Sequence, residues 1–150
     1  MVERITNDEV FALTALLSEM KVCQPGTIPP PAADKLISLT CDLQEAAMRL
    51  QKRIDLIREQ TRPEGVPSWG EASEEQRAAW NRAMTGQLDL LGSKAAGMSF
   101  EPLTREEFAA VIAANTLTGR QAALLRRTLL ASEAAAGGPE PAQEQKGGEE

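Results

Sequence analysis

The chain has 150 residues, of which 42% are hydrophobic, and it carries a net charge of −6 with two cysteines and no histidine. This length suits one domain with its own core, and the acidic balance argues against general attraction to nucleic-acid phosphates. Two thiols without histidine exclude a four-ligand zinc site within the chain. No apolar run approaches the ~18 residues that a membrane span needs.

Aromatic residues make up 3% of the chain and tyrosine is absent, so aliphatic side chains must fill the interior. Strands are enriched in aromatic and β-branched residues, so this composition favours helices. We predict an all-α fold, a bundle of four to five helices around one long central helix. A helical domain should span 1–132 and a disordered acidic tail 133–150, since the sequence from Gly137 onward has no apolar residue larger than alanine.

A capping box at 6–9 predicts the first helix, of about 16 residues, and a turn-forming segment at 23–28 ends it. Prolines at 29–31 and 63 mark the ends of the long helix, of about 29 residues and ~43 Å. Apolar residues at spacings of three and four form one stripe along it: Leu36, Leu39, Leu43, Ala46, Ala47, Leu50, Ile54 and Ile57. The first helix covers little more than half of this stripe, and the uncovered remainder predicts a homodimer.

Three more capping boxes, at 73–76, 104–107 and 118–121, predict three more helices. A loop at 92–103 and a break at 115–117 separate these helices. Their expected buried residues follow helical spacing: Trp80, Met84, Leu88 and Leu91, then Phe108, Val111 and Ile112, then Leu124, Leu125, Thr128 and Leu129.

The residues that most often carry catalysis are missing. Without histidine the commonest general base is absent, and the chain has no phosphate loop, dinucleotide fingerprint or calcium loop. We predict a protein that is not an enzyme, with no cofactor and no metal. Acidic pairs at 8–9, 74–75 and 106–107 lie where helix dipoles favour negative charge, which is a structural role. Cys23 and Cys41 are expected to be small, partly buried side chains, and a disulfide within or between chains is the alternative.

Five residues are candidates for partner binding. Arg49, Lys52, Arg53 and Arg58 make the long helix locally basic, and this pattern describes either a solvated face or the binding face for an acidic partner. Trp69 lies in a polar loop, either exposed as a binding anchor or folded back onto the end of the long helix. We predict a protein partner of unknown identity, no membrane association and a cytoplasmic location.

The segment from Thr104 to Leu130 offers a second interpretation. Its helix, break and helix match a helix-turn-helix, in which Arg120, Arg126 and Arg127 would face nucleic acid. The acidic pair at 106–107 and the many alanines and leucines of the second helix argue against this interpretation. A small DNA-binding regulator or packaging protein is therefore the alternative function.

The order of elements also resembles a known family. An opening Ile5-Thr6-Asn7-Asp8-Glu9, the start Ala33-Asp34-Lys35-Leu36 of a helix ending in 53–58, Leu90-Leu91, and Glu101-Pro102-Leu103-Thr104 are similar to segments of an uncharacterised family of small helical proteins of tailed bacteriophages and prophages. The resemblance covers 5–130, and the family has no established catalytic residues to transfer. It implies a viral or prophage accessory role, as a virion component or as a modulator that docks on a host or phage machine.

Overall fold

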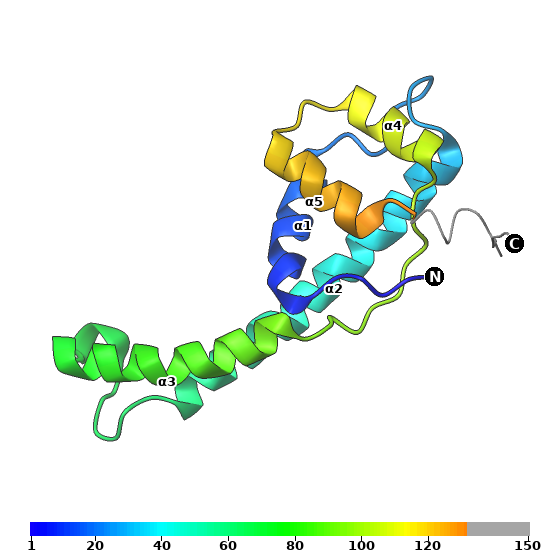
Figure 1. Ribbon diagram of the computed structural model, residues 1–150. Helices are drawn as coiled ribbons and strands as arrows, with labels where there is room; N and C mark the ends of the chain where they lie inside the picture. Colours follow the sequence, from blue (N-terminus) through cyan, green and yellow to red (C-terminus); the bar gives the residue numbers. More distant parts are fainter. Residues whose placement is uncertain (132–150) are drawn as a thin grey trace, which may run out of the picture. The chain divides into compact units, whose positions relative to one another are not determined.

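The computed structural model describes residues 1–131 (Figure 1). Five α-helices and one short 3-10 helix lie within them: α1 Asn7–Glu19, α2 Pro30–Gln60, η1 Trp69–Glu71, α3 Glu74–Ser93, α4 Arg105–Ala114 and α5 Gly119–Leu129. Extended pairing over 1–131 is limited to three isolated β-bridges. The predictions of an all-α fold and a long central helix are confirmed. The tail predicted at 133–150 lies outside the described residues.

The predicted helix starts are found at the expected places. In each of three complete capping boxes the first side chain accepts a backbone N–H and the fourth accepts one in return: Ser73 with Gln76, Thr104 with Glu107, and Thr118 with Gln121. At α1, the Glu9 carboxylate accepts the backbone N–H of Thr6 at 2.9 Å. Two ends differ from expectation, because α1 has 13 residues rather than about 16 and α3 runs on to Ser93.

The chain divides into two compact units. We name Glu3–Ala15 together with Cys41–Met98 the hairpin unit, and Met1–Val2, Leu16–Thr40 and 99–131 the terminal unit. Helices α1 and α2 contribute residues to both. The prediction of one helical domain at 1–132 stays a prediction.

In the hairpin unit, α3 runs antiparallel alongside residues 41–60 of α2 (Figure 1), and both segments are about 30 Å long at ~1.5 Å per residue. The apolar stripe of α2 is buried at Leu43 and Leu50 and half-buried at Ile54 and Ile57. Cover for the last two comes from α3, which corrects the expectation that this stretch lies open. The homodimer itself stays a prediction.

The start of α1 is fastened to the end of α3. The buried Asn7 side chain donates to the Leu91 carbonyl at 2.8 Å, and its backbone N–H donates to the Lys94 carbonyl at 2.9 Å. A side chain at Gly92 would collide with the Asp8 carboxylate, whose nearest atom would lie 2.0 Å from the added Cβ. Glycine at this position therefore permits the close approach of the two helices.

In the terminal unit, α4 packs against α5. Backbone hydrogen bonds from Leu103 to the Leu129 carbonyl, at 2.7 Å, and from Ala131 to the Leu103 carbonyl, at 2.8 Å, fasten the end of α5 beside the start of α4. The side chains of Phe108, Leu125 and Leu129 are buried in its core. These contacts fix the position of α5 relative to α4, the two helices that we interpret from the sequence as a helix-turn-helix.

Candidate functional site

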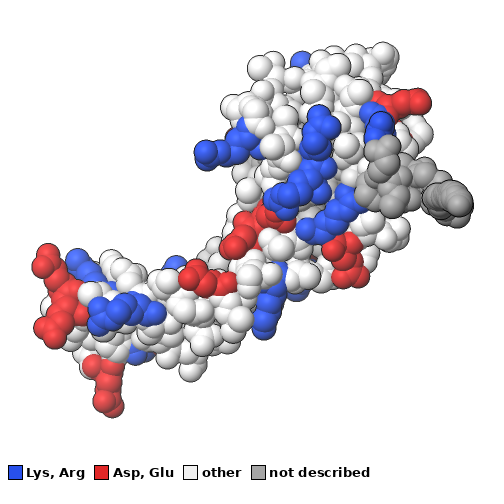
Figure 2. Space-filling view, in the orientation of Figure 1, with Lys and Arg blue, Asp and Glu red and all other residues white. Residues whose placement is uncertain are grey.

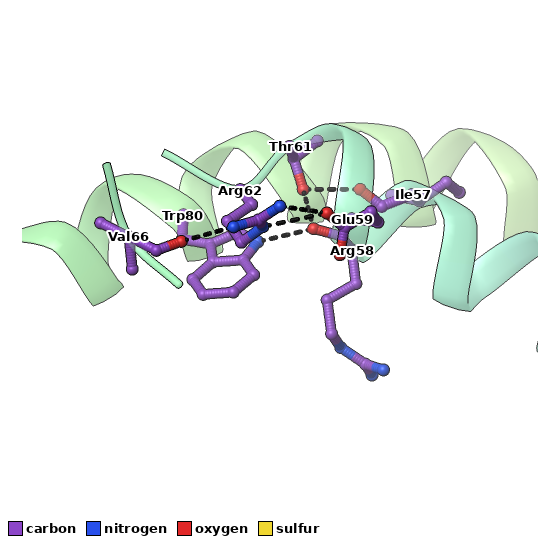
Figure 3. Close-up of polar contacts among 7 residues, drawn as sticks. All are labelled: Ile57, Arg58, Glu59, Thr61, Arg62, Val66 and Trp80. Carbon is purple, nitrogen blue, oxygen red and sulfur yellow. Dashed lines mark hydrogen bonds and ion pairs between the residues drawn. The ribbon is translucent and has the colours of Figure 1, made fainter. Parts of the chain in front are cut away.

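The C-terminal end of α2 is capped by groups from the loop and from α3. The last carbonyls of a helix have no partner within it. Here the Trp80 indole N–H donates to the Arg58 carbonyl at 3.0 Å, and the Thr61 hydroxyl and backbone N–H donate to the Ile57 carbonyl at 2.7 and 3.0 Å (Figure 3). Because Trp80 is only 3% exposed, this bond lies inside the hairpin unit and fixes the position of α3 along α2.

Arg62 fastens the loop that follows. Its guanidinium donates to the Val66 carbonyl at 2.8 Å and pairs with the Glu59 carboxylate (Figure 3). Val66 is buried in a small cluster with Ala72 and Trp80. The tip of the hairpin therefore has its own apolar core and a defined loop path.

Trp69 lies on this tip rather than standing free. Its ring centroid is 5.3 Å from that of Trp80, and the Arg77 guanidinium lies 5.7 Å from the Trp69 ring centroid. Arg77 also donates to the Trp69 carbonyl at 3.0 Å. Trp69 therefore packs on two side chains of α3 while 40% of it stays exposed, and both interpretations of this residue stay predictions.

A groove runs between α2 and α3, and we call it the hairpin groove. It encloses about 240 Å³ and is lined by Arg53, Leu56, Ile57, Gln87, Leu90, Leu91 and Lys94. Leu56 is 58% exposed and Leu90 is 55% exposed. Cationic side chains therefore flank two leucines that the chain leaves largely in water, which makes this groove a candidate site.

The four basic residues predicted on α2 do not share one face. Arg49 and Arg58 are nine positions apart, which at ~100° per residue places them on opposite sides of the helix. Arg58 pairs with Asp55 at 3.2 Å. Arg49, Lys52 and Arg53 lie on the flank that carries Leu56, and their side chains form no ion pair or hydrogen bond with the described residues. Three of the four thus belong to one surface with the groove.

Sequence reasoning missed the leucines of this groove. The available signal was their phase, because Leu56 lies between the stripe positions Ile54 and Ile57, and Leu90 lies between the buried-line positions Leu88 and Leu91. Apolar residues that fall outside a buried stripe are candidates for a second surface.

The three arginines of the predicted helix-turn-helix do not lie on one face of α5 either. Arg120 and Arg127 are seven positions apart and share one side of α5, whereas the Arg126 guanidinium lies 5.4 Å from the Phe108 ring centroid. Figure 2 shows basic side chains over α5 on the face in view. On the Arg126 side, α4 and α5 border an open groove of about 630 Å³ that contains Phe108, Ile112 and Leu130.

The most buried charges of the terminal unit form a pair that the sequence did not predict. Lys35 Nζ lies 2.7 Å from Glu107 Oε1, and the two side chains are 12% and 13% exposed. Burial alone would raise the pKa of Glu107, but hydrogen bonds from Lys35 and Thr104 and the charge of Lys35 outweigh it and lower that pKa. Because Glu107 also completes a capping box, the pair joins the starts of α2 and α4 and has a structural role.

No protein-family model, curated protein or solved structure matches the chain.

Groups that could hold a metal are not assembled in the part of the chain that the structure describes, where no three His, Cys, Asp or Glu side chains converge. Both cysteines are free thiols with exposed side chains, which corrects the expectation of partial burial. Over the same residues, each helix is either too short or too polar to span a bilayer.

Proposed function

We propose that this chain is a non-catalytic protein–protein interaction protein that binds a protein partner at the hairpin groove. The observation that carries the proposal is the pair of exposed leucines, Leu56 and Leu90, in one groove flanked by Arg53 and Lys94. An apolar centre with a polar rim is the usual anatomy of an interface, and the rim charges select the partner.

The capped hairpin supports this role, because a binding surface on a fixed scaffold loses less conformational entropy when a partner docks. The Trp80 bond to Arg58 and the Arg62 bond to Val66 hold α2 and α3 in register at their joined end. The resemblance to small helical phage and prophage proteins supports an accessory role, as a virion component or as a modulator of a host or phage machine in the host cytoplasm.

The test is site-specific photo-cross-linking in a bacterial lysate. A photoreactive residue at Leu90 should capture a defined protein, and the same residue at Ile37, which is 46% exposed on α2, should not. The change Leu56→Asp should abolish capture from position 90, and nuclease treatment should leave it unchanged. Equal capture from both positions would show that the groove is not the binding surface.

DNA binding through α4 and α5 is the second candidate, favoured by the shared placement of Arg120 and Arg127 on α5. It predicts that a labelled duplex binds with an affinity that falls steeply with salt. Replacing Arg120 and Arg127 together with alanine should remove binding, while Arg126→Ala, which loses the contact with Phe108, should change it less. Absence of salt-sensitive binding by the unmodified chain eliminates this candidate.

A further inference from the structure

The cationic side chains around the hairpin groove have no acidic partners of their own. Arg49, Lys52 and Arg53 lie within about 60° of Leu56 around α2, at ~100° per residue. Lys94 lines the groove from the end of α3. Within the described residues, none of these four cationic side chains forms an ion pair or a hydrogen bond.

The acidic side chains nearest to this surface are engaged elsewhere or lie further along α2. Asp55 pairs with Arg58 at 3.2 Å, and Glu59 pairs with Arg62. Glu45 lies about 16 Å before the groove leucine of α2, at ~1.5 Å per residue. The groove therefore has a local excess of positive charge, although the whole chain has a net charge of −6.

We propose that the occupant of the hairpin groove is an acidic amphipathic helix of the protein partner. This inference rests on the proposed function, since it names the chemistry of what binds at the same groove. Apolar side chains of that helix cover Leu56 and Leu90, which are 58% and 55% exposed. Its carboxylates face the four cations, so the leucines supply apolar burial and the charges select the partner.

A helix is the backbone conformation that suits this groove. Both walls of the groove are helices, whose backbone N–H and C=O groups bond within each helix. An extended segment would leave its own backbone groups on the buried side without partners, whereas a helix satisfies them internally. The side-chain ridges of a third helix also fit the groove between two neighbouring helices.

On α3 the side that carries Leu90 is smooth enough for such a helix to lie on it. Ala79, Ala83 and Gly86 are exposed and recur at spacings of four and three, in line with Leu90, over about 16 Å. A Cβ added to Gly86 would meet nothing within 4 Å. Because small side chains let two helices approach closely, the partner helix reaches Leu90 along about three turns of α3.

Nucleic acids and anionic lipids are also negatively charged, and the leucines of the groove distinguish them from the proposed helix. A phosphate backbone laid over Leu56 and Leu90 would lose hydration against apolar side chains, which is unfavourable. The leucines line a recess of about 240 Å³ between α2 and α3. A flat bilayer surface does not enter such a recess, whereas one row of helical side chains does.

Fluorescence anisotropy with a defined probe tests the inference on the full chain. The probe is a labelled, stapled helical peptide of about four turns, with leucines at spacings of three and four on one face and glutamates on both sides of them. The chain should bind it with a Kd on the order of 100 μM. A matched peptide with lysines in place of the glutamates should bind at least about tenfold more weakly. Equal binding of the two peptides, or no binding of the acidic one, overturns the inference.

Variants of the chain locate the binding of the acidic peptide. Leu56→Asp and Arg53→Glu should each weaken it at least about tenfold. The matched controls are Ile37→Asp, on the same helix but outside the groove, and Arg82→Glu, an exposed cation about 120° around α3 from Lys94. Both controls should have little effect, and circular dichroism should show unchanged helix content. Equal weakening by the two arginine changes would mean general charge attraction and would overturn the inference.

Two more probes examine the other negatively charged classes. A labelled DNA duplex and vesicles of phosphatidylglycerol with phosphatidylcholine should bind more weakly than the acidic peptide. If either binds more tightly than the peptide, and Leu56→Asp removes that binding, the groove belongs to that class of ligand and the inference is overturned.

The failure of this inference is distinguishable from that of the proposed function. Mass spectrometry of the product cross-linked from position 90 identifies the partner segment that touches the groove. An acidic segment with apolar residues at spacings of three and four supports the inference. A basic or uncharged segment overturns it and leaves the groove as a protein-binding surface. Absence of both capture and peptide binding overturns the two proposals together.

Discussion

Replacing Glu107 with glutamine should destabilise the protein by about 2–3 kcal/mol at neutral pH. Breaking a buried ion pair costs about 3–5 kcal/mol, and exposed pairs contribute about 0–1 kcal/mol. The Lys35–Glu107 pair, with side chains 12% and 13% exposed, is near the buried limit. We expect a smaller loss than for a fully buried pair, because two partners of Lys35 remain in the variant. Its ammonium still donates to the Pro102 carbonyl at 3.2 Å and still lies 3.6 Å from the Glu101 carboxylate.

The loss should depend on pH in a defined direction. Because the folded pKa of Glu107 is lowered from its ordinary value of 4.5, the carboxylate adds stability above that value. This contribution disappears as the pH falls through the folded pKa. Below it the natural side chain is protonated and resembles glutamine, so the difference between the two proteins should become small.

Urea unfolding followed by far-UV circular dichroism, at about pH 7 and about pH 3, measures this difference. Glutamine retains the capping bond to Thr104, so the change isolates the charge. The matched control is Glu106→Gln, an exposed neighbour in the same helical turn, which should cost less than about 0.5 kcal/mol. The reasoning is refuted if both variants behave alike, or if the Glu107 loss is equal at the two pH values.

Three further changes test local contacts, each by urea unfolding. Trp80→Phe keeps an aromatic ring but removes the 3.0 Å bond to the Arg58 carbonyl and leaves a cavity where the larger buried indole lay, so it should cost about 2–4 kcal/mol; an unchanged stability would deny the cap a role. Asn115→Ala removes the bonds of 2.7 and 3.0 Å to the Lys21 backbone and should cost about 2 kcal/mol, whereas a loss below half of that would show that water replaces them. Ser73→Ala removes the α3 cap and should cost about 1 kcal/mol, and Ser73→Thr should restore most of it.

The sequence determined the helices of this protein. The capping boxes at 73–76, 104–107 and 118–121 each act through hydrogen bonds within four residues, so their effect is independent of the rest of the chain. The prolines at 29–31 and 63 fix the long helix by equally local sterics. Helical phase could also have separated Arg58 from Arg49, because the angle between them depends only on their spacing.

Only the tertiary structure decided the surfaces. Leu56 and Leu90 meet in one groove because Trp80 and Arg58 set the register of two helices joined by a loop. Lys35 pairs with a glutamate 72 residues away in the sequence. Such contacts depend on how helices pack, and many registers bury similar apolar stripes with similar energy. A local pattern can show which face of a helix is buried, but the packing of the whole chain selects what covers that face and which residues stay exposed.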